Sequence, residues 1–104
     1  MPFKEAFIAL VPDAIAERHR CLVETDLYRL AVVLVSDANE AVEVCRQLVQ
    51  TDGVQSLALC PGFTHEDVGR IVEAVGDGIA VAVARGDGHS ADLLKEGLQR
   101  AGWF

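Results

Sequence analysis

Four short apolar runs alternate along this 104-residue chain with segments whose apolar residues recur every three or four positions. The runs cover residues 3–11, 30–35, 54–60 and 79–84, and they are rich in small or β-branched side chains. Consecutive apolar positions are typical of strands that are covered on both faces, as in a parallel sheet. The alternation therefore predicts four parallel strands that are joined by helices.

The segments between the runs carry helical stripes. The three clearest stripes are Ala41, Val44, Cys45 and Leu48; Val68, Ile71, Val72 and Val75; and Leu93, Leu94, Leu98 and Ala101. Asp37, Thr64 and Ser90 precede them as predicted N-caps, whereas Gly76 and Gly102 are predicted to end the second and third helices. A further helix is predicted over 13–24, with a stripe of Ile15, His19 and Leu22.

A strand followed by a helix, repeated four times, predicts a single α/β domain over residues 1–104. Right-handed crossovers place helices on both faces, so we expect a three-layer α/β/α sandwich of the Rossmann-like or flavodoxin-like kind. Its four-stranded, mostly parallel sheet is assigned the order 2-1-3-4. A hairpin-based α+β fold is not expected, because no tight turn separates two strands. Half of a (β/α)₈ barrel has the same pattern and stays open as an alternative.

Charge and cysteine usage narrow the class of protein. Acidic residues outnumber basic ones by 16 to 9, so the net charge is −7, and such a chain repels phosphate backbones. The run at residues 79–84 is too short to span a membrane, and the N-terminus lacks a secretion signal. We therefore expect a cytoplasmic protein without nucleic-acid or membrane partners. Three cysteines without C-x-x-C spacing indicate free thiols, with Cys21 and Cys45 packed in the core, and no zinc site.

Several short motifs resemble a family of small bacterial proteins classed as a domain of unknown function. They are His19-Arg20, Glu24-Thr25, residues 40–44, Gly53-Val54-Gln55 and Leu59-Cys60-Pro61-Gly62-Phe63, and the resemblance spans residues 5–90. Members of that family usually have an acidic residue two positions before the cysteine and a glycine after it. This chain has Ala58 and Pro61 there. The resemblance implies the fold and supplies no catalytic assignment.

Ligands of open parallel sheets bind beyond the carboxyl ends of the strands, where the strand order reverses. With the order 2-1-3-4, this point lies between the first and third strands, with the fourth beside them. The sequence predicts ligand-binding residues in the loops that follow: Cys60, Gly62, Phe63, Thr64, Arg85, Gly86, Gly88, His89 and Ser90. Any bound small molecule or buffer anion is expected against residues 60–64 or 85–90.

Cys60 is the candidate catalytic residue. It ends a buried strand just before a predicted helix, where backbone dipoles lower a thiol pKa, and His65 or His89 would be its base. Packing in a small apolar hole is the alternative. Pro61 favours packing, because it lacks the backbone N–H that an oxyanion hole would use.

The loop Gly86-Asp87-Gly88-His89-Ser90-Ala91 matches G-x-G-x-x-A between a strand and a helix. It opens the last unit rather than the first, so we expect no dinucleotide and no other cofactor. Glycines at a helix start, with Arg85 as countercharge, suggest a small anionic ligand, and a plain flexible turn without a ligand is the alternative. His19, with Arg20, Glu24 and Thr25, forms a second polar group that is assigned to the same pocket, with packing as the alternative.

Two classes of function follow from these residues. The first is a non-catalytic module that binds a small molecule, an anion or a partner. The alternative is a small enzyme, either a Cys60-dependent hydrolase or transferase or a lyase whose site a second subunit completes. We also expect a homo-oligomer, most simply a dimer, in which the terminal Trp103 and Phe104 dock onto the second copy. Folding of these two aromatic residues back onto the chain's own helices is the alternative.

Overall fold

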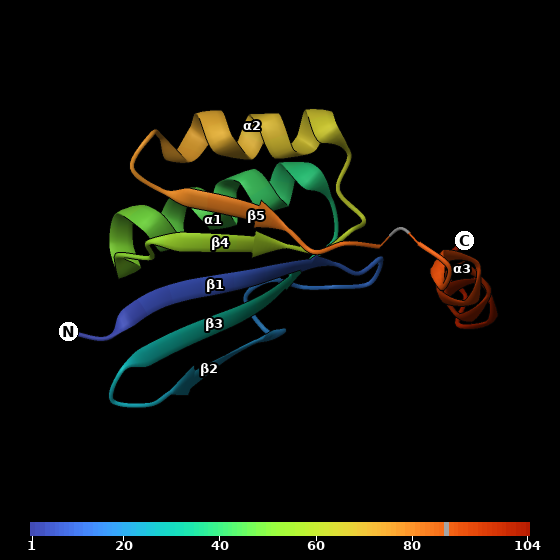
Figure 1. Ribbon diagram of the computed structural model, residues 1–104, viewed down its shortest axis with the longest axis horizontal. Coiled ribbons are helices and arrows are strands. Elements are labelled where there is room, and N and C mark those ends of the chain that lie inside the picture. The colour runs from blue at the N-terminus through green and yellow to red at the C-terminus, as the bar shows by residue number, and fades with distance from the viewer. Residues whose placement is uncertain (87) are drawn as a thin grey trace.

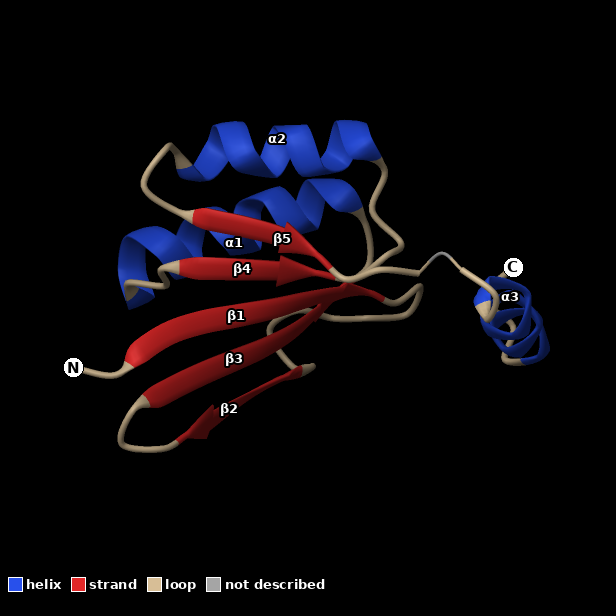
Figure 2. Cartoon of the chain, in the orientation of Figure 1, coloured by secondary structure: helices blue, strands red, loops and turns tan. Residues whose placement is uncertain are grey.

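The computed structural model describes residues 1–86 and 88–104, so Asp87 of the glycine-containing loop lies outside the described residues. The chain forms, in order, β1 (Phe3–Leu10), β2 (Arg20–Glu24), β3 (Tyr28–Val35), α1 (Ala38–Asp52), β4 (Ser56–Leu59), α2 (His65–Val75), β5 (Ala80–Val83) and α3 (Ala91–Arg100) (Figure 1). Figure 2 shows the strands as one twisted sheet, with α3 beyond one end of it. None of the described helices has the length and apolarity needed to cross a membrane.

The sheet has five strands in the order β2-β3-β1-β4-β5. The strands β3, β1, β4 and β5 are parallel, and β2 is antiparallel to β3. The α/β class is therefore confirmed. The predicted count of four strands is wrong, because β2 adds a fifth strand at the edge beside β3. The full order therefore differs from the prediction, although the four predicted strands, which are β1, β3, β4 and β5, keep the order 2-1-3-4 among themselves. A half-barrel would hold its strands in sequence order, so that alternative is wrong as well.

The segment 13–24, predicted as a helix, contains turns followed by β2. The backbone N–H of Ile15 donates to His19 Nδ1 at 2.8 Å, which closes one of these turns. From Arg20 to Glu24 the chain then pairs along β3. The helical stripe was weak because one of its three residues, His19, is polar. Pairing with an apolar strand outweighs such a weak preference.

The connection between β2 and β3 is a tight turn built on Thr25. Its backbone N–H donates to the carbonyl of Tyr28 at 2.8 Å. Its Oγ1 accepts from the N–H groups of Leu27 at 3.3 Å and Tyr28 at 3.1 Å. A threonine hydroxyl thus closes a hairpin that has neither the glycine nor the asparagine typical of such turns. The expectation that the chain contains no hairpin turn is wrong for this reason.

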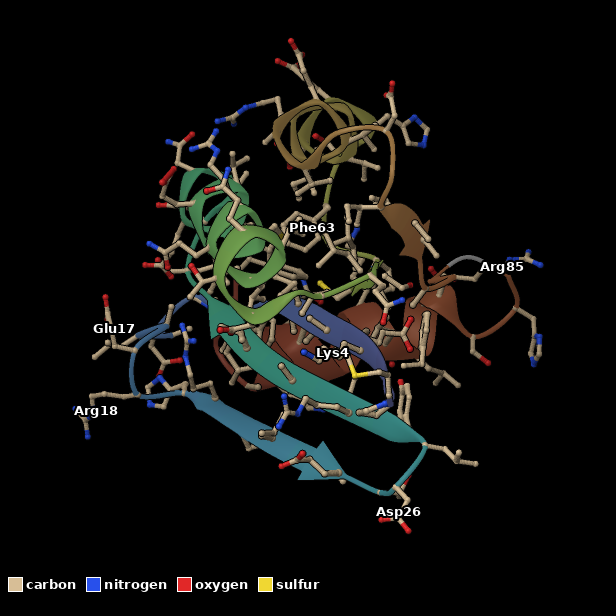
Figure 3. All side chains as sticks on the ribbon, turned by 90° about the vertical axis from the view of Figure 1, so that its left-hand side faces the viewer. Lys4, Glu17, Arg18, Asp26, Phe63 and Arg85 are labelled. Carbon is tan, nitrogen blue, oxygen red and sulfur yellow. The ribbon has the colours of Figure 1, made fainter. Side chains whose placement is uncertain are left out.

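Both α1 and α2 lie on one face of the sheet, and α1 packs along α2 (Figure 3). The connections from β3 to β4 and from β4 to β5 progress across the sheet in the same direction, so right-handed crossovers place both helices on the same side. The connection from β1 to β3, which would reach the other side, contains the hairpin instead of a helix. The predicted three-layer sandwich is therefore wrong, because none of the described helices covers the second face.

The core lies between the sheet and these two helices. The strand residues Ala6, Ile8, Val33, Val35, Leu57 and Leu59 face Ala41, Val44, Cys45 and Leu48 of α1, together with Phe63 and Ile71. The stripe of α1 and the burial of Cys45 are confirmed. By contrast, Leu93 and Leu94 of α3 are 67% and 49% exposed, and Cys21 is exposed on β2. Their predicted burial is wrong, because α3 leaves the sheet and residue 21 belongs to an edge strand.

The helix ends agree more closely with the sequence-based predictions than the positions of the helices on the sheet do. Asp37 Oδ1 accepts from the N–H of Glu40 at 2.8 Å, and Thr64 forms a capping box with Asp67. Gly76 and Gly102 both have positive φ, at 87° and 85°. Ser90 occupies the N-cap position of α3, but its side chain makes no capping hydrogen bond. Caps are local interactions, so the sequence predicts them well.

Candidate functional site

A cavity of about 660 Å³ lies at the carboxyl ends of the parallel strands, between the sheet and α3. We call it the strand-end cavity. Its walls come from the ends of β1, β3 and β4, the starts of α1 and α2, and the C-terminal segment. Figure 1 shows α3 beyond the carboxyl ends of the parallel strands. The site therefore forms where the strand order reverses, as open α/β sheets require.

Most of the lining is apolar. Leu10, Val11 and Pro12 contribute from the end of β1, and the chain's C-terminal part contributes Leu94, Leu98, Trp103 and Phe104. The sequence assigned Leu94 and Leu98 to the core, and Trp103 and Phe104 to a second copy of the chain, with the chain's own helices as the alternative. Here they face the strand ends of their own chain. Trp103 is 37% exposed and Phe104 is 66% exposed, so both are only partly covered.

Cys60 lies in the wall of this cavity at the end of β4. Its backbone N–H donates to the carbonyl of Ile8 at 3.0 Å, and its Sγ accepts from the N–H of Leu10 at 3.3 Å. Among the described residues, no histidine makes a hydrogen bond to Sγ. The thiol is held by the backbone of β1, with Pro61 following it. This arrangement provides packing and a polar contact, but neither a base nor an adjacent N–H for a nucleophile.

The two helix starts that line the cavity carry carboxylates. Asp37 caps α1, and the Asp67 carboxylate accepts from the N–H of Thr64 at 3.1 Å. The Thr64 hydroxyl in turn accepts from the N–H of Asp67 at 3.1 Å, and Glu40 accepts from the N–H of Ser36 at 3.0 Å. The chain's own side chains thus already accept from the N–H groups of Ser36 and Glu40 at the start of α1, and from those of Thr64 and Asp67 at the start of α2. The local charge is negative.

Gly86 sets the course of the segment that leads to α3. An ideal Cβ at this position would lie 2.4 Å from Cβ of Pro61, a distance that non-bonded carbon atoms do not tolerate. Only a glycine allows residues 84–86 to approach the loop after β4 so closely. This contact holds the chain against Pro61 at the rim of the strand-end cavity.

Of the residues predicted from the sequence, Cys60, Gly62 and Gly86 line the strand-end cavity. Phe63 is buried between the helices and the sheet (Figure 3), whereas Thr64 caps α2. Arg85 points outward in Figure 3, and Gly88, His89 and Ser90 are exposed beyond it. All of these residues follow strands in the sequence. The tertiary structure decides which of them line the strand-end cavity and which lie beside it.

His19 and His65 lie apart from the strand-end cavity. The His19 ring accepts from Ile15 within its own turn, and its carbonyl accepts from the N–H of Leu34 at 2.9 Å. His65 lines a second hollow of about 410 Å³ with Phe63 and Val83, which shares Pro61 and Gly86 with the strand-end cavity. Within residues 1–86 and 88–104, no three His, Cys, Asp or Glu side chains are grouped so as to hold a metal ion.

A polar cluster on the central strand β1 was not predicted from the sequence. Glu5 Oε1 accepts from the Tyr28 hydroxyl at 2.5 Å, and Oε2 accepts from the Ser56 hydroxyl at 2.9 Å. The pKa of Tyr28 is raised above its ordinary value of 10.0. The largest cause is the hydrogen bond to Glu5, and burial and the negative charge of Glu5 add to it. The cluster depends on the strand register. Glu5 is paired with Ser56 on β4 and with Leu30 on β3, and Tyr28 lies two residues before Leu30 on the same face of the sheet.

The architecture defines a two-layer α/β protein with an apolar cavity at the carboxyl ends of its strands. The chain belongs to the family of unknown function DUF6506, whose model matches residues 3–99. This match confirms the resemblance to a family of unknown function. No curated protein and no solved structure matches the chain.

Proposed function

We propose that this protein is a small binding module that holds an uncharged, largely apolar small molecule in the strand-end cavity. The observation that carries the proposal is the cavity itself. Its volume of about 660 Å³ is within the range of small-molecule sites, and apolar side chains such as Leu10, Leu98 and Trp103 form most of its wall. Its position at the carboxyl ends of parallel strands supports the same conclusion.

The charges around the cavity argue for a neutral ligand and against the small anion suggested by the glycine-containing loop. Asp37 and Asp67 are in the lining, and none of the described lining residues is Lys, Arg or His. Bringing an anion beside these two carboxylates costs electrostatic energy, and both carboxylates already accept from an N–H group at their helix start. A neutral molecule avoids this cost.

The surroundings of Cys60 favour binding over the alternative of a Cys60-dependent hydrolase or transferase. Its thiol contacts the β1 backbone, and no described histidine is bonded to it. A nucleophilic cysteine requires a base or a lowered pKa, together with donors for the developing oxyanion. Among the described residues no base is hydrogen-bonded to Cys60, and Pro61 lacks the N–H that an oxyanion would use.

The test uses two dyes of similar size, neutral N-phenyl-1-naphthylamine and the anion 8-anilinonaphthalene-1-sulfonate. The chain's single tryptophan, Trp103, lies in the cavity wall, so binding is read from its fluorescence as well as from the dye. We expect saturable binding of the neutral dye and weaker binding of the anion. Leu98→Ser removes apolar area from the wall, and we expect about tenfold weaker binding of the neutral dye.

Leu93→Ser is the matched control, because Leu93 is on the same helix, is 67% exposed and is outside the cavity lining. Val23→Ser on the sheet is a second control for dye adsorbed elsewhere. Equal affinities for wild type and Leu98→Ser would show that the dye does not bind in the strand-end cavity. Tighter binding of the anionic dye than the neutral one would overturn the ligand class.

A further inference from the structure

The face of the sheet opposite α1 and α2 is an extended apolar surface, here called the open face. Side chains alternate along a strand, so the residues between the core positions point to this side. Its main apolar residues are Phe3, Phe7, Val23, Leu30, Val32 and Leu34. Phe3 is 45% exposed and stacks on Tyr28, with ring centroids 6.4 Å apart, and Val23 is 57% exposed. No described helix lies over this surface (Figure 1).

The Glu5 cluster lies within the open face, and its hydrogen bonds suit a covered surface. Glu5 is the only acidic residue among the described strand residues that point to this side. Each of its carboxylate oxygens accepts from a hydroxyl group, one on β3 and one on β4. A carboxylate in water needs no such partners, whereas one removed from water is costly unless it is hydrogen-bonded. Tyr28 and Ser56 supply those bonds in advance.

The size of the open face indicates what covers it. Five strands spaced about 4.8 Å apart, with eight residues in β1 and β3, make a surface about 24 Å wide and up to about 26 Å long. The ten residues of α3 form a rod about 15 Å long and 10 Å wide. Such a helix would cover less than half of the surface. A second open face has the same dimensions.

Charge also favours a second copy of the chain. Each chain carries a net charge of −7, so two copies repel one another through most of their surfaces. The open face is the exception, since its one carboxylate is already paired within its own chain. Two copies that meet through this face keep their other acidic residues in solvent.

We propose that two copies of the chain associate through their open faces, as two sheets packed against each other. The contact is isologous, with the same residues on both sides of a two-fold axis. Side chains from two facing sheets interdigitate across about 10 Å. This dimer uses a different surface from the C-terminal aromatic residues suggested by the sequence. It leaves the strand-end cavity of each copy in place and does not depend on the proposed ligand.

Sedimentation velocity over a dilution series of the full chain tests the proposal, with Val23→Lys as the diagnostic variant. We expect wild type to approach twice the 11.2 kDa chain mass as concentration rises. A charge at Val23 would be placed between the apolar faces, and we expect at least about tenfold weaker association. Val72→Lys is the matched control, because Val72 is a similarly exposed valine, at 45%, on α2. We expect it to associate as wild type does.

Alkylation of Cys21 provides a second measurement, which uses the wild-type protein and requires no variant. Cys21 is exposed on β2 and points to the open face, beside Val32. We expect its alkylation by iodoacetamide to slow as the concentration of wild-type protein rises. A chain that stays at 11.2 kDa at millimolar concentration would overturn the proposal. So would unaltered association of a folded Val23→Lys variant. Slow alkylation of Cys21 at every concentration in a monomer would show that the chain's own α3 covers the face instead.

Discussion

At the scale of single residues, the contact between Gly86 and Pro61 decides where the C-terminal part of the chain lies. Residue 86 is the point at which the chain leaves the sheet, and a side chain there would collide with the loop after β4. Because Gly86 has no Cβ, the chain can pass close to Pro61, and this determines the position of α3. The helix in turn forms one wall of the strand-end cavity. The sequence pattern predicts a different role for a glycine in this place, as part of a phosphate-binding fingerprint.

Gly86→Ala is therefore expected to displace the segment that carries α3. The added methyl group would have to move Pro61 or residues 84–86, and we expect a loss of about 1–3 kcal/mol in the free energy of unfolding. Trp103 would become more accessible, so acrylamide should quench its fluorescence more efficiently. Gly69→Ala is the control, because no atom lies within 4 Å of its Cβ position and φ is not positive there. In α2 that change should stabilise by about 0.5–1 kcal/mol. Unaltered stability and quenching of Gly86→Ala would contradict this account.

At the scale of elements, the hairpin of β2 and β3 accounts for most of the difference between the expected and the observed fold. It occupies the chain between β1 and β3, where a crossover helix was predicted. The turn depends on a hydroxyl that accepts two backbone N–H groups, because the loop contains no glycine, asparagine or proline. The strand β2 is exposed along its whole length, so this turn contributes a large share of what holds it in register.

Replacing Thr25 by alanine tests that dependence. Removing the acceptor leaves the N–H groups of Leu27 and Tyr28 to solvent, and we expect a loss of about 0.5–1.5 kcal/mol in unfolding free energy. Amide hydrogen exchange in β2 should accelerate more than exchange in β1 or β4, because the edge strand opens without the core. Thr25→Ser keeps the hydroxyl and should retain most of the protection. Equal acceleration in every strand would indicate global destabilisation rather than loss of the turn.

At the scale of the whole molecule, the core is one-sided: it lies between a single face of the sheet and two helices. Cys45 lies in this core and is fully buried on α1. Burial disfavours the thiolate and raises the pKa of Cys45 from 9.0 to about 12. The folded protein therefore keeps a proton on this sulfur at pH values where the unfolded chain has lost it.

Because the pKa is higher in the folded state, the contribution of Cys45 to stability is complete below about pH 9 and is lost as pH rises toward about 12. Between those values the slope approaches about 1.4 kcal/mol per pH unit. Urea unfolding of the wild type and of Cys45→Ala, from pH 7 to pH 11, measures how this contribution to stability depends on pH. We expect the stability difference between the two proteins to shrink above pH 9. The pKa of Tyr28 is also raised, but Tyr28 is present in both proteins and does not affect the difference between them. Parallel curves of unfolding free energy against pH would contradict the prediction.

The features that the sequence determined are those with local causes. The stripe of α1, the caps at Asp37 and Thr64, and the apolar runs that became β1, β3, β4 and β5 all depend on side chains within a few positions of one another. The position of the candidate site followed as well, since the carboxyl ends of parallel strands meet at one edge of a sheet. Cys60 was therefore predicted at this edge and lines the cavity there.

Three features were decided only by the tertiary structure. The residues Arg20–Glu24 became a strand because β3 offered a partner along the whole segment, and a weak local preference yielded to that pairing. The second face of the sheet stayed open because the remaining crossovers progress in one direction, and handedness then puts both helices on one side. Leu94, Leu98 and Trp103 reached the strand-end cavity because Gly86 permits a close approach to Pro61, a contact between residues 25 positions apart that periodicity cannot encode.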